Sequence, residues 1–361
     1  MTTKYNLVKE TIKSWIVEGK VAPHQKIMSE NELVEHFSVS RHTVRQAIGE
    51  LVNEGWLYRE QGRGTFCAYR EHLRRKHTDK MIGIVTTYIS DYIFPSIIRG
   101  AESFLSSKGY SIILASTNNQ IEEEKNCLQT LLGKNIDGLI IEPTRSAMYN
   151  SNLDYYLQLE ANQIPYVMIN ATYPQLQPPS LTMDDELGGY IATKHLIDSG
   201  HKQIVGLFKT DDLQGVNRMK GFVRAHREHQ LPITPSTIIS FNTEEKEWKP
   251  QQELRELLSA KGSRPTGIVC YNDQIAISLL DVTRELKLRV PEDISMVGYD
   301  DSLLAEASEV KLTSIKHPQT IMGEEAAKML LDIIEGKADR QTLPPVVYKP
   351  ELVIRKSTQR V

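Results

Sequence analysis

Two segments decide the fold of the N-terminal part of this chain, SVSRHTVRQAI at residues 38–48 and QGRGTF at residues 61–66. In the first segment and just beyond it, apolar side chains recur at the three- and four-residue spacing of a helix with one buried face. These side chains are Val44, Ala47, Ile48 and Leu51. Ser40 stands just before them, where a hydroxyl can cap the free backbone N–H groups of a helix. The pattern predicts a capped helix that begins at Arg41.

Further helices and two short strands are expected around this helix. Ser29 and Glu32 have the spacing of a capping box and predict the start of a second helix. An amphipathic pattern predicts an opening helix over residues 5–18. Residues 56–58 and 65–67 read as strands joined by a glycine-containing turn, since glycine tolerates positive φ. This order of elements predicts a winged helix-turn-helix, an α+β domain.

Several side chains of this predicted domain are suited to DNA. An arginine on a helix in the major groove can bind guanine through two hydrogen bonds, worth about 1–3 kcal/mol of discrimination. A helix N-terminus can hold a phosphate, and an arginine at a wing tip can contact a phosphate or the minor groove. The candidate DNA-binding residues are Lys4, Tyr5, Glu30, Arg41, His42, Thr43, Arg45, Gln61, Gly62 and Arg63.

The alternative is a small solvated domain whose arginines are ordinary surface charges. Residues 1–80 have a net charge of only +4, which does not decide the question. The helix order, the caps and the Gly-Arg-Gly tip favour DNA binding. These features resemble the GntR family of bacterial regulators over residues 1–70. Gln25 and Met28 depart from that family's usual Gly and Pro, in the loop before the second helix. The matching motifs are Ser29-Glu30, Leu33, Val39-Ser40-Arg41, Thr43-Val44-Arg45, Ala47, Leu51, Glu54-Gly55 and Gly62-x-Gly64-Thr65-Phe66.

Composition indicates an ordinary globular protein with more than one domain. The chain has 361 residues, 40% hydrophobic and 25% charged, and its net charge is −3. The net charge of residues 81–361 is therefore −7, so this part should stay off DNA. Three widely spaced cysteines show neither metal-ligand spacing nor a disulfide framework. Without an apolar signal segment or a membrane-length apolar run, we expect a cytoplasmic protein that holds no metal and contacts no membrane.

From residue 81 onward, apolar strands alternate with amphipathic helices, which predicts parallel sheets in an α/β domain. Eight strand candidates lie between residues 81 and 298, and about nine strands favour two lobes over one sheet. We expect the winged helix-turn-helix at 1–70, a linker at 71–80, and a two-lobed effector-binding and dimerisation domain at 81–361. Its lobes are expected at 81–174 with 316–342, and at 175–315 with 343–361.

Polar and aromatic side chains follow the predicted strands. Ligands of parallel sheets bind beyond the carboxyl ends of the strands. A polyhydroxyl ligand needs aromatic faces and charged or amide groups there, although some of these residues could instead cap helices or lie in the core. No glycine-rich phosphate cradle follows the first strand, and no nucleophile–base motif indicates an enzyme. The candidate effector-binding residues are Tyr92, Phe94, Glu142, Asn170, Lys209, Arg218, Asn272, Asp273, Asp300 and His317.

The C-terminal part resembles the LacI/GalR family of sugar-responsive regulators and periplasmic sugar-binding proteins. The motifs cover residues 81–361 in order, but a GntR-type domain replaces the family's own helix-turn-helix and hinge helix. They are Ile82-Gly83-Ile84-Val85, Asp137-Gly138-Leu139-Ile140, Arg218-x-x-Gly221-Phe222, Tyr271-Asn272-Asp273, Val297-Gly298-Tyr299-Asp300-Asp301 and Leu312-Thr313-Ser314-Ile315.

The pairing of the two domains, with TTYISDYIFP at residues 86–95, resembles the L-arabinose-responsive repressors of bacilli over the whole chain. The resemblance implies a repressor of arabinose-utilisation genes that leaves its double-stranded operator when L-arabinose binds, with no other cofactor. The residues alone leave open another sugar, a purine, or a corepressor that tightens DNA binding. We expect a homodimer, because helix-turn-helix domains usually bind two half-sites by two-fold symmetry.

Overall fold

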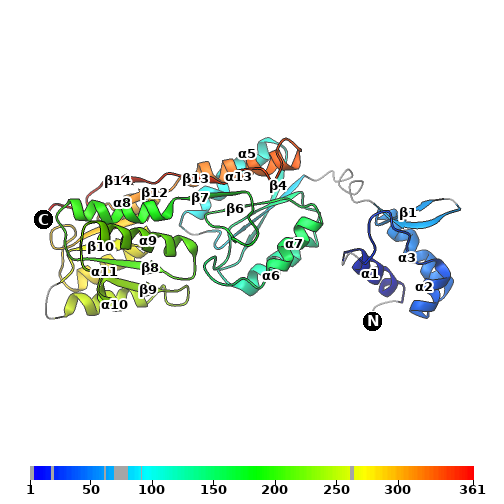
Figure 1. Cartoon of the computed structure of the whole chain (residues 1–361), viewed down its shortest axis with the longest axis horizontal. Coiled ribbons are helices and arrows are strands. Elements are labelled where there is room, and N and C mark those ends of the chain that lie inside the picture. Colours follow the sequence, from blue (N-terminus) through cyan, green and yellow to red (C-terminus); the bar gives the residue numbers. More distant parts are fainter. Residues whose placement is uncertain (1–3, 18–19, 61, 69–79, 91, 261–263) are drawn as a thin grey trace. The chain divides into compact units, whose positions relative to one another are not determined.

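A computed structural model describes residues 4–17, 20–60, 62–68, 80–90, 92–260 and 264–361. The chain forms two compact units, Met1–Asp79 and Lys80–Val361 (Figure 1). Most of the predicted linker at 71–80 lies outside the described residues. No described helix is long and apolar enough to span a membrane. None of the three cysteines forms a disulfide, and the described His, Cys, Asp and Glu side chains form no cluster that could hold a metal ion.

The first unit is the predicted winged helix-turn-helix. Ser29 and Glu32 form the expected capping box, and the Ser40 hydroxyl accepts from the backbone N–H of Thr43. The apolar face of the third helix packs into one core with side chains such as Val8 and Leu33. The elements are α1 (Lys4–Val17), α2 (Glu30–Phe37), α3 (Arg41–Asn53), β1 (Leu57–Glu60) and β2 (Gly64–Cys67), with β1 and β2 antiparallel.

The second unit contains two six-stranded sheets, which confirms the two-lobed α/β prediction. The first sheet is parallel throughout. Its strand order is β13 (Val346–Tyr348), β7 (Ser180–Met183), β6 (Tyr166–Ile169), β5 (Gly138–Ile141), β3 (Met81–Thr86) and β4 (Ser111–Ser116). Two helix pairs pack against it: α5 (Phe94–Ser107) with α13 (Gln319–Ile334), and α6 (Ile121–Leu132) with α7 (Leu153–Ala161).

The second sheet is parallel except for one edge strand, β14, which runs antiparallel to β12. Its order is β14 (Glu351–Val353), β12 (Thr313–Lys316), β11 (Ser295–Asp300), β10 (Gly267–Cys270), β8 (Ile204–Lys209) and β9 (Ile238–Phe241). The accompanying helices are α8 (Asp185–Asp198), α9 (Leu213–Glu228), α10 (Lys249–Ser259), α11 (Asp273–Glu285) and α12 (Leu303–Ala307), with a short 3₁₀ turn at Pro235–Thr237.

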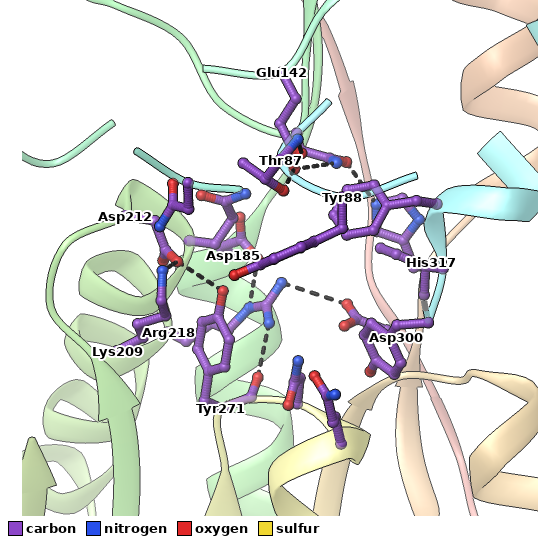
Figure 2. Close-up of a pocket in the computed structure, with 18 of the residues that line it drawn as sticks. Thr87, Tyr88, Glu142, Asp185, Lys209, Asp212, Arg218, Tyr271, Asp300 and His317 are labelled. Atoms are coloured by element: carbon purple, nitrogen blue, oxygen red, sulfur yellow. Dashed lines mark hydrogen bonds and ion pairs between the residues drawn. The ribbon is translucent and has the colours of Figure 1, made fainter. Parts of the chain in front are cut away.

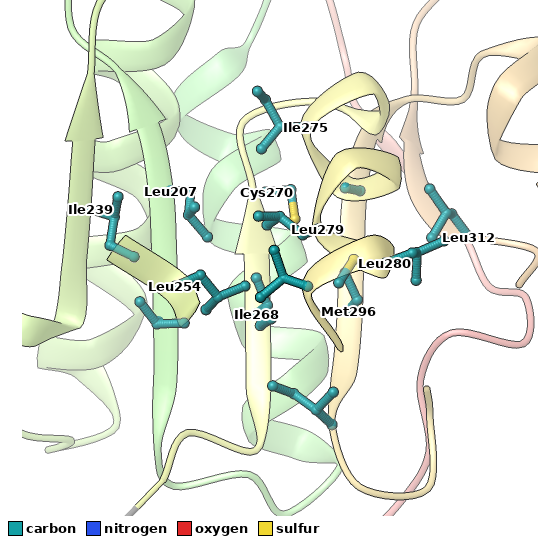
Figure 3. Close-up of a cluster of buried hydrophobic side chains, with 14 of the residues drawn as sticks. Leu207, Ile239, Leu254, Ile268, Cys270, Ile275, Leu279, Leu280, Met296 and Leu312 are labelled. Atoms are coloured by element: carbon teal, nitrogen blue, oxygen red, sulfur yellow. The ribbon is translucent and has the colours of Figure 1, made fainter. Parts of the chain in front are cut away.

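Apolar strands buried on both sides hold each lobe together. In the second lobe, Ile268 of β10 packs with Leu254 of α10 and Leu279 of α11 (Figure 3). Phe222 of α9 and Leu196 of α8 belong to a second cluster of the same lobe. Side chains buried on both faces explain why these strands read as continuous apolar runs in the sequence.

The predicted lobe boundaries are wrong at two places. Ser180–Met183 and Val346–Tyr348 were assigned to the second lobe, but both strands belong to the first sheet and pair with each other. The proline-rich segment before Ser180 is a loop within the first lobe. The chain crosses between lobes after β7, after β12 and after β13. Neither segment was among the predicted strands, because a strand of three or four residues carries little periodicity and its pairing partner decides where it lies.

Close packing of α8 against α9 generates a stability prediction. A Cβ added at Gly221 would lie 2.0 Å from the backbone oxygen of Glu186, an atom that cannot rotate away. We expect Gly221→Ala to lower the free energy of unfolding by about 1–3 kcal/mol, because overpacking outweighs the better helix propensity of alanine. Chemical denaturation measures this. The matched control is Gly133→Ala, where the nearest atom is 3.5 Å away and little change is expected. Equal stability of the two variants would contradict the packing argument.

Candidate functional site

A pocket in the second unit collects side chains from both lobes. They come from segments that follow the carboxyl ends of parallel strands, as expected for open α/β sheets (Figure 2). The lining residues are Thr87, Tyr88, Tyr92, Ile93, Phe94, Asn119, Glu142, Pro143, Asn170, Met183, Asp185, Lys209, Asp212, Gln214, Arg218, Lys246, Tyr271, Asn272, Gln274, Ile275, Asp300 and His317. We call this pocket the cleft.

The cleft brings together nine of the ten predicted effector-binding residues, although they are spread over more than two hundred positions of sequence. The nine are Tyr92, Phe94, Glu142, Asn170, Lys209, Arg218, Asn272, Asp300 and His317. Asp273 does not line the cleft. Its carboxylate accepts hydrogen bonds from the Ser302 backbone and hydroxyl, and from the Ser314 hydroxyl, at 2.6–2.9 Å. Burial and the neighbouring Asp300 raise the pKa of Asp273 to about 7. Its side chain therefore ties loops together, and Asn272 caps α11.

A chain of hydrogen bonds fixes one wall of the cleft. Glu142 accepts from the Thr87 backbone at 2.9 Å, the Thr87 hydroxyl at 2.6 Å and the Asn170 amide at 2.9 Å. The Asn170 oxygen lies 3.1 Å from Nε2 of His317. Because the amide nitrogen of Asn170 already donates to Glu142, its oxygen must accept, and Nε2 of His317 carries the proton. Nδ1 of His317 is therefore an acceptor.

His317 stays neutral in this site. Burial lowers its pKa to about 3, and the positive charge of Arg218 acts in the same direction. Burial also raises the pKa of Glu142 above its usual range, opposed by the hydrogen bonds from Thr87 and Asn170. This wall of the cleft therefore presents the uncharged imidazole of His317 and the carboxylate of Glu142. The acceptor positions of that carboxylate are largely occupied by donors from Thr87 and Asn170.

Arg218 occupies the centre of the opposite wall, on α9. Its Nε donates to Asp185 at 2.8 Å, its Nη1 donates to the Tyr271 carbonyl at 2.7 Å, and its Nη2 lies 3.5 Å from Asp300. The guanidinium carbon is 3.5 Å from the centre of the Tyr299 ring, a cation–π contact. Burial and the nearby Arg218 act oppositely on Asp185, and burial prevails, raising its pKa to about 6.

Lys209 is paired just as fully. Its Nζ lies 2.8 Å from Asp211 and 2.8 Å from Asp212, and Asp212 also accepts from the Tyr271 hydroxyl at 2.8 Å. Burial alone would lower the pKa of Lys209, but the two carboxylates outweigh it and raise this pKa. Lys209 is thus a charged donor whose remaining hydrogen can point to a ligand.

Three buried acceptor atoms of cleft residues find no hydrogen-bond donor within the described part of the chain. They are Oε1 of Gln214, Nδ1 of His317, and Oδ1 of Asp300, which has only the 3.5 Å ion pair with Nη2 of Arg218. A buried acceptor without a donor costs about 1–3 kcal/mol. A ligand with several hydroxyl groups would satisfy such acceptors, whereas a ligand that only accepts would not.

Tyr92 joins the two lobes beside the cleft. Its hydroxyl donates to the Tyr299 carbonyl at 2.9 Å and accepts from the Asp273 backbone at 3.1 Å. Phe94 opens α5, and its ring centre is 5.9 Å from that of Tyr88, so two aromatic faces adjoin the polar groups. Tyr92 therefore serves as an interlobe contact as well as a lining residue.

Several lining residues were not among the predicted ones. Asp185 and Asp212 are helix-start acids, and Tyr271 directly follows β10. The strand-end rule would have pointed to Asp185 if β7 had been recognised as a strand. Asn119 and Lys246 come from loops whose positions depend on tertiary packing, and the sequence carries no comparable signal for them.

The first unit exposes the predicted DNA-binding side chains along α2 and α3. Arg41 and Arg45 are each 60% exposed, and both face Glu30, which accepts from Nε of Arg45 at 2.7 Å. His42 is exposed next to them. Thr43 hydrogen-bonds to the Ser40 cap at 2.8 Å and so helps to hold the start of α3. The helix N-terminus and both guanidinium groups therefore lie together on one surface of the unit.

The other predicted DNA contacts lie at α1 and at the wing. Lys4 is exposed at the start of α1, and Tyr5 is half-buried. Gly62 has a φ of 75° in the turn between β1 and β2, and Arg63 beside it pairs with Glu60 at 2.5 Å. Gln61 lies outside the described residues.

Both units of the chain match known protein families. Residues 4–67 match the bacterial regulatory proteins of the gntR family, and residues 193–358 match the periplasmic binding protein-like domain. The arabinose metabolism transcriptional repressor of Halalkalibacterium halodurans is 56% identical, over 99% of this chain and 97% of its own length. The repressor of the same name from Geobacillus stearothermophilus is 52% identical, over 99% and 98%.

A solved structure shows the likeness of the second unit. A LacI family transcriptional regulator from Enterococcus faecium, with bound ribose, superposes with a TM-score of 0.66 at 26% identity, over 78% of this chain and 100% of that one. A winged helix-turn-helix joined to a two-lobed binding domain defines a DNA-binding transcriptional regulator that responds to a small molecule. The chain belongs to the family of arabinose metabolism transcriptional repressors. It is a repressor and not an enzyme.

The arrangement on α3 generates a prediction about DNA reading. We expect Arg45→Ala to lower the affinity for operator by the equivalent of about 1–3 kcal/mol and to leave random-sequence DNA nearly unaffected, since base contacts carry the discrimination. Lys4→Ala should weaken both DNAs alike and reduce the salt dependence. Fluorescence anisotropy at several salt concentrations measures both. Equal losses on operator and random DNA for Arg45→Ala would refute its role as a base-reading residue.

Proposed function

We propose that this repressor controls arabinose-metabolism genes and leaves its operator when L-arabinose binds in the cleft. The observation that carries the sugar assignment is the set of three buried acceptor atoms that form no hydrogen bond, on Gln214, Asp300 and His317. An aldopentose offers several hydroxyl donors within a small volume. The full-length likeness to two arabinose metabolism repressors supports the choice of arabinose among the sugars.

The chemistry of the cleft favours a neutral ligand. Two of its three cations, Lys209 and Arg218, are already paired with carboxylates at 2.8 Å. The third, Lys246, lies 3.6 Å from Glu247 and 5.4 Å from the centre of the Tyr88 ring. Its His317 is uncharged, and Glu142 and Asp300 would repel an anion. The buried polar groups would be left unpaired by an analogue that lacks one hydroxyl, which is how such sites discriminate strongly. The neutral sugar is therefore preferred over its phosphate or acid.

Release requires that the sugar bind the two forms of the protein differently. A 100-fold loss of operator affinity corresponds to about 2.7 kcal/mol of differential binding. By linkage, operator DNA must weaken sugar binding by the same factor. We further propose that the repressor acts as a homodimer, since two helix-turn-helix units on one two-fold axis match two half-sites.

Operator binding measured by fluorescence anisotropy at fixed salt tests the proposal. We expect L-arabinose to release the operator, and D-ribose, D-xylose and D-galactose to have little effect. Release by a different sugar or by a purine would overturn the effector assignment. Tighter operator binding in the presence of L-arabinose would instead show a corepressor.

The neutral acceptor in the cleft gives a second prediction. We expect His317→Phe to weaken L-arabinose binding about tenfold or more, because the ligand hydroxyl loses its acceptor. Operator binding without sugar should not change. The matched control is His229→Phe, at the end of α9, where the ring bonds only to the Ala225 carbonyl. Calorimetric titration gives both affinities. Undiminished sugar binding by His317→Phe would remove this residue from the site.

A further inference from the structure

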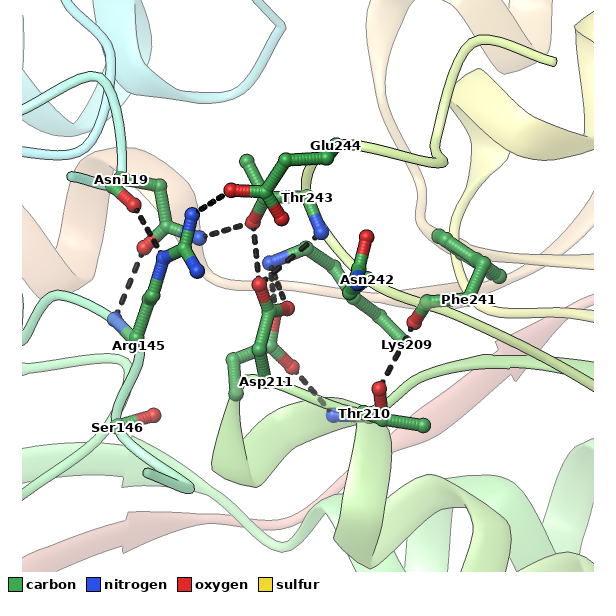
Figure 4. A network of polar contacts seen from close by, with 12 residues as sticks. Asn119, Arg145, Ser146, Lys209, Thr210, Asp211, Phe241, Asn242, Thr243 and Glu244 are labelled. Atoms are coloured by element: carbon green, nitrogen blue, oxygen red, sulfur yellow. Dashed lines mark hydrogen bonds and ion pairs between the residues drawn. The ribbon is translucent and has the colours of Figure 1, made fainter. Parts of the chain in front are cut away.

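A second polar network joins the two lobes at the rim of the cleft (Figure 4). The first lobe supplies Asn119 from the loop after β4 and Arg145 from the loop after β5. The second lobe supplies Thr243 and Glu244 from the loop after β9. The Asn119 amide donates to the Thr243 hydroxyl at 2.6 Å, and Nη2 of Arg145 pairs with the Glu244 carboxylate. We call these four residues the rim clasp.

The first-lobe half of the rim clasp is held in place before it reaches the other lobe. The Arg145 backbone N–H donates to the Asn119 side chain at 2.9 Å, and its Nε donates to the Asn119 carbonyl at 3.0 Å. Both residues have positive φ, 45° and 54°, which this loop geometry requires. The Arg145 side chain is only 15% exposed. Because the guanidinium is oriented in advance, less side-chain entropy is lost when it meets Glu244.

The Asn150 and Asn152 side chains anchor the same loop to a buried carboxylate. Both amides donate to Glu124, which is fully buried and also accepts from the Tyr156 and Tyr173 hydroxyls, at 2.7–2.9 Å. The β5–α7 loop is therefore held rigidly on the first lobe. Its contact with Glu244 forms only when the second lobe lies close enough to the first.

The second-lobe half of the rim clasp connects to the cleft. The Thr243 backbone and hydroxyl donate to Asp211 at 3.0 and 2.6 Å. Asp211 in turn lies 2.8 Å from Nζ of Lys209, which lines the cleft. Since the Thr243 hydroxyl donates its single hydrogen to Asp211, it must accept the hydrogen bond from Asn119. Each group along this series of hydrogen bonds therefore has a donor matched to an acceptor. Interlobe contacts and a ligand-facing lysine thus share one hydrogen-bond network.

We propose that the rim clasp holds the lobes closed over the bound effector, so that Arg145 and Glu244 set how long the effector stays, although neither lines the cleft. Their contact can form only when the lobes are together, and its free energy therefore belongs to the closed form alone. A ligand shifts an equilibrium only by its different affinities for the two forms, and a contact made in one form shifts it in the same way. Arg145 and Glu244 are positioning residues and touch no ligand. The inference rests on the proposed function for its probe, L-arabinose.

Stopped-flow and calorimetric measurements on the full chain test the rim clasp. We expect Arg145→Ala and Glu244→Ala each to raise the dissociation rate of L-arabinose about tenfold and to change the association rate less than twofold. The double variant should be no worse than either single one, since all remove the same link. The charge-reversed pair, Arg145→Glu with Glu244→Arg, should recover most of the loss.

A matched control lies within one lobe. Arg255 of α10 pairs with Glu285 of α11 at 2.7 Å, and this ion pair does not cross the cleft. Arg255→Ala should leave the dissociation rate unchanged, because isolated exposed ion pairs contribute little and this one does not distinguish open from closed lobes. Retained far-ultraviolet circular dichroism and cooperative thermal unfolding show that each variant is folded.

Amide hydrogen exchange without sugar separates this inference from the proposed function. Loss of the rim clasp should speed exchange at residues 240–246 and 143–147. If the wild type fails to bind L-arabinose, the effector assignment is wrong. Amide hydrogen exchange without sugar then still tests whether the rim clasp holds the lobes together. If Arg145→Ala and Glu244→Ala alter neither the dissociation rate nor the exchange, the rim clasp has no closing role.

Discussion

The buried positive charge of Arg218 is the constraint around which the second unit is arranged. The Arg218 residue is only 5% exposed, and a buried guanidinium is very costly unless it is paired and hydrogen-bonded. Its partners come from three separate places: Asp185 at the start of α8, the Tyr271 carbonyl just after β10, and Asp300 with the Tyr299 ring in β11. Satisfying this one group fixes the relative positions of these elements, and with them the floor of the cleft.

The same requirement explains the polar character of the cleft. These buried charges are already paired with other groups of the protein. Arg218 pairs with Asp185, Lys209 pairs with Asp211 and Asp212, and Glu142 accepts from Thr87 and Asn170. What remains are single acceptor positions and a few free hydrogens. Such a surface recognises a ligand by many individual hydrogen bonds and not by net charge, which is the chemistry that a neutral sugar requires.

Much of this could be predicted from the sequence where the signal is local. The caps at Ser29 and Ser40 and the apolar face of α3 are set by residues within one or two helical turns of one another. The long apolar strands were likewise recognisable, and the strand-end rule placed nine of ten candidates in the cleft. The rule was wrong for Asp273, because a helix-start acid can turn toward neighbouring loops as easily as toward a ligand.

The sequence by itself determined the two kinds of domain, their order, and nine of the residues that line the cleft, because helix caps, apolar periodicity and strand ends are short-range features. Only the tertiary structure decided how those side chains are used. The membership of β7 and β13 in the first sheet depends on pairing between strands more than 150 residues apart. The protonated nitrogen of His317 depends on Asn170, and the contact of Arg145 with Glu244 depends on the approach of two lobes. Hydrogen-bond direction and charge pairing are properties of neighbours in space, and sequence spacing does not specify those neighbours.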